Sequence, residues 1–263
     1  GSEGDHGRHD VERDPQRKTY VIHGDSIRVP RQVTSLVPIT HEFDESVPKV
    51  GHVIRSDLEG KHWEVFCSGL RNPYGLAWND AHDLFTFDAD AERHTGLPWY
   101  RPTRIIHLMA GVDYGWRHPE NPWPSYLPDT VPPIAKIGRG SPTALKFGYA
   151  SDFPADYQQA LFALDWSYGR VLAVHVVPNG ASYTGHAEVF LRGRPFSVCD
   201  LGFLSDGSML ILTGGRDTPS SIYQVRHTGE KPKSVSTAQM LAREAHAQET
   251  RQRRRSIESL FEE

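Results

Sequence analysis

The residues best suited to binding chemistry lie in one stretch of the chain, from Gly69 to Arg117. Within it, Arg71 and Asn72 stand directly before Pro73 and a strand-like run. Arginine offers a planar fork of N–H donors to carboxylate and carbonyl oxygens, and asparagine both donates and accepts hydrogen bonds. The pair therefore predicts a ligand site at the end of a strand. The alternative is that Arg71 binds loop carbonyls while Asn72 forms a turn before Pro73.

Three carboxylates follow at alternate positions: Asp88, Asp90 and Glu92. At the end of a strand, alternate side chains share one face, and these three would repel one another if they had no partner. A hard cation such as Ca²⁺, which prefers oxygen ligands, would compensate them. Nearby arginines would do the same; they are Arg93, Arg101 and Arg104. The residues alone leave both arrangements open. Of the two, the metal site at the three carboxylates is the one that would give this segment a chemical function.

Aromatic side chains accompany these charges. Trp99 and Tyr100 directly precede Arg101 in the same loop. Rings at strand ends can stack on a flat cofactor or on the face of a sugar, whereas packing between neighbouring sheets is their other common role. We predict that Trp99, Tyr100 and Arg101 join Arg71 and Asn72 in a cofactor site.

The residues do not identify a catalytic base. The 14 histidines are scattered, without HxH or HExxH spacing, and a catalytic histidine needs an orienting partner that a sequence cannot show. The sequence has no GxSxG, no P-loop and no GxGxxG in a βαβ setting, so the common hydrolase, NTPase and dinucleotide-binding classes lack support. It also has no CxxCH, so we expect no covalent haem in this chain.

The composition gives further limits. A net charge of −4 over 263 residues provides no general electrostatic reason to bind nucleic acid or an anionic membrane. No apolar run approaches the roughly 18 residues that a transmembrane helix needs. Cys67 and Cys199 lack metal-type spacing. They are either buried free thiols or a disulfide.

The elements that must hold these residues are short strands. Short apolar runs alternate with segments rich in glycine, proline and aspartate, which is typical of strands joined by turns. Residues 1–18 are charged and are expected to form a loop, and residues 151–160 a short helix. The predicted strands lie in 19–25, 51–57, 62–69, 74–79, 83–90, 104–111, 143–150, 160–166, 170–178, 187–193, 200–215 and 221–229.

A faint internal repeat sets the architecture. Residues 76–88 and 201–213 each read as strand, Asp-containing turn, strand. A period of 40–50 residues built of short antiparallel strands is typical of propeller blades. We therefore predict an all-β fold, a β-propeller of which residues 1–229 supply about four blades. The blade-like units are roughly 16–66, 67–116, 139–192 and 195–229.

The remaining segment, residues 230–263, is expected to be a linker and a C-terminal α-helix, because glycine and proline are absent from Ser234 onward. Six residues could form a sparse apolar stripe along this helix: Met240, Leu241, Ala245, Ile257, Leu260 and Phe261. The basic run from Arg251 to Arg255 is expected to be a solvated face, with a nucleic-acid or lipid patch as the alternative.

Several strings in this chain resemble the glucose/sorbosone dehydrogenase-like propellers, which are quinoproteins. The likeness extends in order over most of residues 1–229, and is greatest to the propeller of large bacterial membrane-bound dehydrogenase-like and haem-binding-domain proteins. The strings include GDHG (4–7), HGDS (23–26), GLRNPYGLAW (69–78), FTFDADAE (85–92), GLPWYRPTR (96–104) and TGGRDTPSSIYQV (213–225).

The resemblance implies a six-bladed propeller that uses pyrroloquinoline quinone (PQQ) and Ca²⁺ to oxidise a sugar or alcohol, in the periplasm or outside the cell. It gives Arg71 and Asn72 a place at the quinone. The loop whose backbone carbonyls help to hold Ca²⁺ in the relatives is much altered here. The catalytic histidine of the relatives precedes the GDxG turn and would fall before residue 1. The resemblance therefore implies either a C-terminal piece of a propeller, completed by further blades or accompanied by a cytochrome c domain in another segment or chain, or a shortened, non-oxidising branch of the family.

The function expected from the sequence is that of a dehydrogenase-like propeller, which passes hydride from a small sugar or alcohol to a quinone. A non-catalytic propeller that binds carbohydrate or protein is the first alternative. A calcium-dependent lactonase-type hydrolase is the second, and it would need carboxylate and asparagine ligands that converge from several blades.

Overall fold

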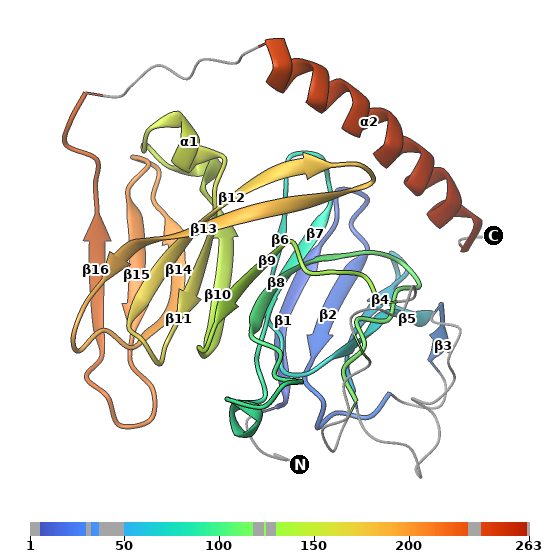
Figure 1. Cartoon of the computed structure of the whole chain (residues 1–263), viewed down its shortest axis with the longest axis horizontal. Coiled ribbons are helices and arrows are strands. Elements are labelled where there is room, and N and C mark those ends of the chain that lie inside the picture. The colour runs from blue at the N-terminus through green and yellow to red at the C-terminus, as the bar shows by residue number, and fades with distance from the viewer. Residues whose placement is uncertain are drawn as a thin grey trace. The chain divides into compact units, whose positions relative to one another are not determined.

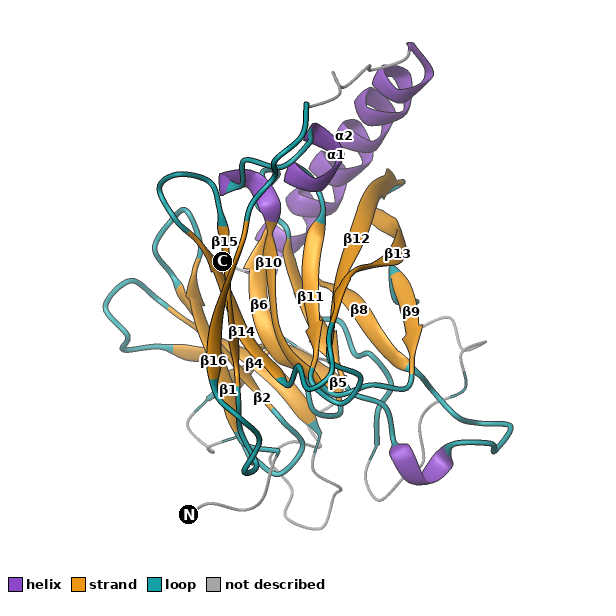
Figure 2. Ribbon diagram, turned by 90° about the vertical axis from the view of Figure 1, so that its left-hand side faces the viewer, coloured by secondary structure: helices purple, strands orange, loops and turns teal. Residues whose placement is uncertain are grey.

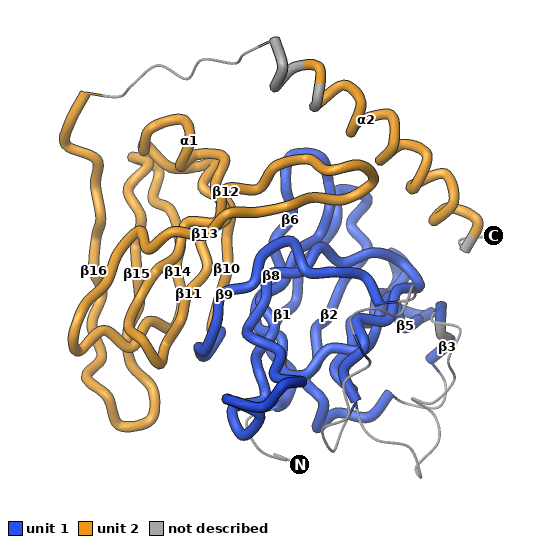
Figure 3. Tube along the Cα trace, in the orientation of Figure 1, with its two compact units in different colours: residues 1–142 blue, residues 143–263 orange. Residues whose placement is uncertain are grey.

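The computed structural model describes residues 6–29, 33–36, 50–117, 124, 130–230 and 238–261. The chain divides into two compact units, residues 1–142 and residues 143–263, coloured separately in Figure 3. Strands make up most of the regular structure in both units (Figure 2).

The first unit holds two sheets (Figure 1). One has the order β1-β2-β4-β5-β3, in which β3 pairs parallel to β5 and the other pairs are antiparallel. Its strands are β1 (Arg8–Arg13), β2 (Thr19–His23), β3 (Thr34–Ser35), β4 (Gly51–Ser56) and β5 (Trp63–Leu70). The other is an antiparallel meander of β6 (Tyr74–Trp78), β7 (Leu84–Asp88), β8 (Thr103–Leu108) and β9 (Ala135–Gly138).

The core of the first unit explains why its strands are rich in branched and aromatic residues. Every residue of β7 and of β8 is buried, so both faces of the second sheet are covered and the usual polar alternation disappears. The cluster around Ile22, Val53 and Leu84 joins residues of both sheets. The Leu76 amide of β6 also donates to Asp10 Oδ2 of β1 at 2.7 Å. The loops at the ends of these strands are therefore attached to a packed core.

The second unit holds the antiparallel sheets β10-β11-β12-β13 and β14-β15-β16, and two α-helices. The first sheet consists of β10 (Pro142–Phe147), β11 (Leu161–Asp165), β12 (Arg170–Asn179) and β13 (Ser182–Arg192). The second consists of β14 (Val198–Phe203), β15 (Met209–Thr213) and β16 (Ser221–Val225). The helices are α1 (Ala155–Gln158) and α2 (Ala238–Glu258). Buried side chains such as Phe162, Val198 and Met209 form one core between the two sheets.

The described residues form four sheets of short strands and a C-terminal helix, which confirms the predicted fold class. The expected loop over residues 1–18 is wrong in part, because Arg8–Arg13 form β1 and pair with β2. A charged strand is allowed there because it is an edge strand with one face toward solvent. The helix expected over residues 151–160 is reduced to the four residues of α1. Both cysteines are free thiols, so the disulfide alternative is wrong.

Where they are described, the side chains of the predicted apolar stripe of α2 are exposed. Ala247 is 1% exposed and Arg251 5%, whereas Ile257 and Leu260 are 54% and 65% exposed. Arg251 lies over the Tyr183 ring of β13, so it is not part of a solvated face. The side chains of Met240, Leu241 and Phe261 lie outside the described residues. No helix among the described residues is long and apolar enough to cross a membrane.

Candidate functional site

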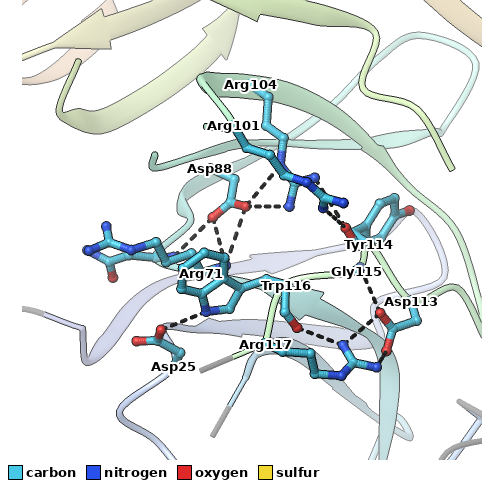
Figure 4. Close-up of polar contacts among 11 residues, drawn as sticks. Asp25, Arg71, Asp88, Arg101, Arg104, Asp113, Tyr114, Gly115, Trp116 and Arg117 are labelled. Atoms are coloured by element: carbon cyan, nitrogen blue, oxygen red, sulfur yellow. Dashed lines mark hydrogen bonds and ion pairs between the residues drawn. The ribbon is translucent and has the colours of Figure 1, made fainter. Parts of the chain in front are cut away.

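The Arg71–Asn72 pair is fixed by one buried carboxylate, that of Asp88 (Figure 4). Strand β5 ends at Leu70, so the two residues begin the following loop. The amides of Arg71 and Asn72 donate to Asp88 Oδ1 at 3.1 and 3.0 Å. Arg104 Nε and Nη2 donate to Asp88 Oδ2 at 3.2 and 2.9 Å. Asp88 therefore acts as a clamp that joins the ends of β5 and β7 to β8, and its charge is compensated by Arg104.

The three predicted metal ligands have separate partners. Strand β7 ends at Asp88, and Glu92 begins a single 3₁₀ turn, so the alternation that would place the carboxylates on one face is broken. Asp90 Oδ2 accepts a hydrogen bond from the Tyr100 hydroxyl at 2.5 Å. Glu92 Oε2 lies 3.0 Å from Arg71 Nη2. The pairing of Arg104 with Asp88 corresponds to the arginine-paired alternative, whereas Glu92 pairs with Arg71 and Asp90 with Tyr100.

The donor set does not fit a Ca²⁺ ion. Both oxygens of Asp88 already accept N–H donors, whereas a Ca²⁺ ligand needs its oxygens directed at the ion. Within the described part of the chain, no group of three histidine, cysteine, aspartate or glutamate side chains has a metal-binding arrangement. The other oxygen of Asp90, Oδ1, is buried without a partner. Burial and the nearby Glu92 charge raise the pKa of Asp90.

The side chain of Arg71 has one nitrogen to spare. Its guanidinium lies 5.7 Å from the centre of the Trp116 ring, and Nη2 pairs with Glu92. Its Nη1 is buried and has no acceptor. A buried donor without a partner costs about 1–3 kcal/mol, more for a charged group. Such an atom is the expected mark of a ligand-binding donor, because a bound acceptor would remove that penalty.

Arg101 has the same property. Its Nη1 donates to the Tyr114 carbonyl at 3.4 Å, and its Nη2 is buried with no partner. Burial and the adjacent Arg104 charge lower the pKa of Arg101 to about 10. With this pKa the guanidinium is still charged at pH 7, and its unpartnered nitrogen can bind an additional acceptor.

The two predicted aromatic members of the site differ. Tyr100 is joined to Asp90 through its hydroxyl. Trp99 is 55% exposed, and its ring meets His94 edge-on at 6.5 Å. The ring that covers Arg71 belongs instead to Trp116.

Three residues of the site have no predicted role: Asp25, His6 and His9. Asp25 is 4% exposed and accepts from Trp116 Nε1 at 2.9 Å and from His6 Nδ1 at 2.5 Å. The Asp25 amide donates to the Arg71 carbonyl at 2.8 Å. His9 Nε2 donates to Asn72 Oδ1 at 2.7 Å. Sequence spacing cannot show links such as those from His9 to Asn72 and from Asp25 to Trp116, because they join residues 63 and 91 positions apart.

Gly24 permits the close approach of Asn72. A Cβ at Gly24 would stand 2.6 Å from Asn72 Oδ1 and 2.8 Å from the His6 backbone. The HGDS string therefore has a physical reason at this position: glycine leaves room for the Asn72 side chain, and the next residue, Asp25, receives Trp116.

A pair of buried imidazoles lies at the paired ends of β2 and β4. His23 and His52 are directly opposite in the register, and their rings stack at 4.8 Å. Burial lowers the pKa of His23 to about 3 and that of His52 to about 4. His52 Nδ1 donates to the Val50 carbonyl at 3.0 Å, whereas His23 Nδ1 is buried without a partner. Both rings are neutral at pH 7.

Searches with the whole chain found no matching protein-family model and no matching curated protein. The solved structures do match. An oxidoreductase (glucose dehydrogenase) from Thermus thermophilus superposes with a TM-score of 0.61 at 18% identity, over 84% of this chain and 65% of its own. The PQQ-bound aldose sugar dehydrogenase of Streptomyces coelicolor gives a TM-score of 0.59 at 16% identity, over 83% and 61%. The soluble aldose sugar dehydrogenase of Escherichia coli, in its apo form, gives 0.57 at 18%, over 78% and 60%.

The chain has the fold of the sugar-dehydrogenase β-propellers. At these identities the likeness concerns the fold alone. The chain spans about three fifths of the length of the sugar dehydrogenases that it matches. The predicted resemblance to glucose/sorbosone dehydrogenase-like propellers is thus confirmed at the level of the fold, and within that fold the roles of Arg71, Asn72, Trp99, Tyr100 and Arg101 stay predictions.

Proposed function

We propose that this chain forms part of a quinoprotein sugar or alcohol dehydrogenase, and that Arg71 and Asn72 bind the quinone. The observation that carries the proposal is the buried Arg71 Nη1, which has no acceptor in the described part of the protein. The clamp at Asp88 fixes the backbone beside it. The description of one structural match, a PQQ-bound aldose sugar dehydrogenase, supports the choice of PQQ.

The chemistry of the donor set fits PQQ, which presents carboxylates and two adjacent quinone oxygens on a flat ring system. When bound, PQQ supplies an acceptor for the hydride of a substrate hydroxyl carbon. Arg71 would bind a quinone or carboxylate oxygen through Nη1, and Arg101 would offer Nη2 in the same way. Trp116 and Asp25 hold the Arg71 loop in place. Tyr100 and Trp99 remain predicted contacts of the same site.

We do not propose Asp88, Asp90 and Glu92 as ligands of a Ca²⁺ ion, because their contacts do not fit one. The lactonase-type alternative needs converging carboxylates, and among the residues that the structure describes none converge. The proposal also implies a small sugar or alcohol as substrate, and the periplasm or the cell exterior as compartment. Further blades or a cytochrome c domain would be its partners.

The test is a titration of the purified chain with PQQ, followed by quinone absorbance and tryptophan fluorescence, and then the addition of aldoses and a dye acceptor. Arg71→Lys keeps the charge and loses the planar fork, so we expect at least about tenfold weaker PQQ binding. Arg253→Lys, at an exposed position of α2, is the matched control and should bind normally. The absence of any spectral change in the parent chain would contradict the proposal. Glycan binding that is unaffected by Arg71→Lys would favour the non-catalytic alternative.

A further inference from the structure

One buried group of the first unit has no role in the quinone proposal: the carboxylate of Asp90. Asp90 is 2% exposed, and its Oδ2 accepts a hydrogen bond from the Tyr100 hydroxyl at 2.5 Å. Its Oδ1 is buried and has no hydrogen-bond partner in the described part of the chain. The large majority of buried side-chain polar atoms in folded proteins are hydrogen-bonded, so an unmatched carboxylate oxygen needs an explanation.

The surroundings of Asp90 leave this oxygen without a donor. Burial removes the hydrogen bonds that water would give a carboxylate, and this desolvation is the first cause that raises the pKa of Asp90. The Tyr100 hydrogen bond lowers the pKa, the Glu92 charge raises it, and the Arg71 charge lowers it. Arg71 is therefore within electrostatic reach of Asp90 but does not bond its Oδ1. A donor from outside the chain would remove the remaining penalty.

The unmatched atoms of this region are of opposite kinds. Arg71 Nη1 and Arg101 Nη2 are buried donors without an acceptor, whereas Asp90 Oδ1 is a buried acceptor without a donor. The quinone and carboxylate oxygens of PQQ are acceptors, so they match the arginine donors and would repel the Asp90 carboxylate. A hydroxyl group carries the O–H donor that Asp90 lacks. The hydroxyls of a substrate therefore fit the atom that the oxygens of PQQ cannot satisfy.

The neighbours of Asp90 suit a sugar. The Tyr100 hydroxyl holds Oδ2, so it fixes the orientation of the carboxylate and with it the position of Oδ1. Tyr100 is half-buried and the adjacent Trp99 is 55% exposed, so Asp90 lies directly beneath exposed parts of its own loop. Aromatic rings pack on the apolar faces of a sugar ring, while the edges of that ring carry O–H groups.

We propose that Asp90 Oδ1 accepts a hydrogen bond from a substrate hydroxyl other than the one that is oxidised, and that Asp90 thereby selects sugars and other polyols over simple alcohols. The inference rests on the proposed function, in which Arg71 binds the quinone. In it Asp90 determines specificity, and the proton released by the oxidation is not assigned to Asp90.

The test compares two ligands that share one ring, D-glucose and its fully O-methylated methyl glycoside, by isothermal titration and tryptophan fluorescence. Methylation keeps the oxygen acceptors and removes every O–H donor. We expect the parent chain to bind glucose about ten- to a hundredfold more tightly than the methylated sugar, because the latter cannot donate to the buried carboxylate. Both titrations are made with the PQQ-free chain and again after PQQ is added.

Asp90→Asn separates this hydrogen bond from the effect of the added methyl groups. With the amide oxygen held by Tyr100, the amide nitrogen takes the place of Oδ1 and is a donor. Glucose binding should therefore weaken by about tenfold or more, while binding of the methylated sugar should not weaken. Asp206→Asn, the same change in an exposed ion pair, is the matched control and should keep the preference of the parent chain. Circular dichroism checks that each variant is folded.

The proposal is overturned if the parent chain binds neither sugar, or binds glucose no more tightly than the methylated sugar. It is equally overturned if folded Asp90→Asn keeps the preference of the parent chain. If Asp90→Asn does not fold, the comparison of the two sugars in the parent chain decides. A preference that depends on Asp90 in a chain that shows no spectral change with PQQ would contradict the quinone proposal alone, so the two failures are distinguishable.

Discussion

The acidic segment from Asp88 to Glu92 and the side chains of His175, His186 and Glu188 on the β12–β13 hairpin place similar groups in opposite settings. In the first unit, Asp88 is 0% exposed and its oxygens accept four N–H donors. In the second, Glu188 stands 43% exposed between a histidine and a tyrosine. In the acidic segment both oxygens of Asp88, Oδ2 of Asp90 and Oε2 of Glu92 have partners within the protein, whereas Asp90 Oδ1 has none.

The physical reason for the difference is desolvation. A buried carboxylate loses its water and must be compensated inside the protein, so folding itself selects its partners. A carboxylate at the surface keeps its water and can exchange it for an external ligand. We therefore expect groups that look chemically capable in a sequence to be structural when they are buried and matched, and to be candidates for ligand binding when a donor or acceptor remains unmatched, as at Arg71 Nη1.

The most severe test of this contrast is Asp88→Asn. The change leaves Arg104 buried without a counter-charge and replaces a carboxylate that holds two backbone amides. Breaking a buried pair on one side typically costs about 3–5 kcal/mol, so we expect the free energy of unfolding in urea to fall by about that much. Asp206→Asn, in an exposed pair with Arg226, should give no measurable change. Equal effects of the two changes would remove the distinction between the regions.

The histidines offer a second test, through pH. The folded-state pKa values of His23 and His52, about 3 and about 4, lie below the ordinary value of 6.5. The unfolded chain therefore binds more protons below pH 6.5, and stability falls as the pH falls. Between pH 7.5 and 5.5 we expect a loss of about 1 kcal/mol for each of the two rings. His52→Gln should flatten this slope in urea unfolding, and His175→Gln, at a partly exposed position of β12, should not. A slope that His52→Gln leaves intact would contradict the assignment.

Trp116→Phe examines how firmly the Arg71 loop is held. It keeps a ring beside Arg71 and removes the donor to Asp25. A hydrogen bond to a charged group contributes about 1.5–3 kcal/mol, so a loss of stability in that range is expected, together with weaker PQQ binding. Trp99→Phe, at an exposed ring, is the control and should not change stability. If Trp99→Phe alone reduced PQQ binding, the cofactor would lie on the Trp99 side of the loop.

The smallest effect is expected from Glu92→Gln. Glu92 pairs with Arg71, but its side chain is 67% exposed. Exposed ion pairs contribute about 0–1 kcal/mol, so the unfolding midpoint should barely move. A large loss would show that Glu92 belongs with Asp88 as a structural group, and the contrast between buried and exposed carboxylates would then need revision.

Several features could be predicted from the sequence because they depend on local physics. Short apolar runs between glycine, proline and aspartate indicated the strands, and in the described residues these strands form four sheets. Arg71 and Asn72 were placed at a strand end because Pro73 follows them. Strand β1 was not predicted, because its residues are charged and their burial depends on the pairing of β1 with β2. The face of α2 was misjudged because Arg251 covers the Tyr183 ring with its long side chain, which an apolar count does not see.

The all-β class, the C-terminal helix and the position of the Arg71–Asn72 pair follow from the order of the residues, since strand, turn and helix preferences act over a few positions. The partner of each charge depends instead on the folded chain. Asp88 meets Arg104 through the pairing of β7 and β8, Asn72 meets His9 over a separation of 63 residues, and His175 meets His186 through the register of β12 and β13. Such contacts are fixed by burial and strand register, which no spacing along the chain contains.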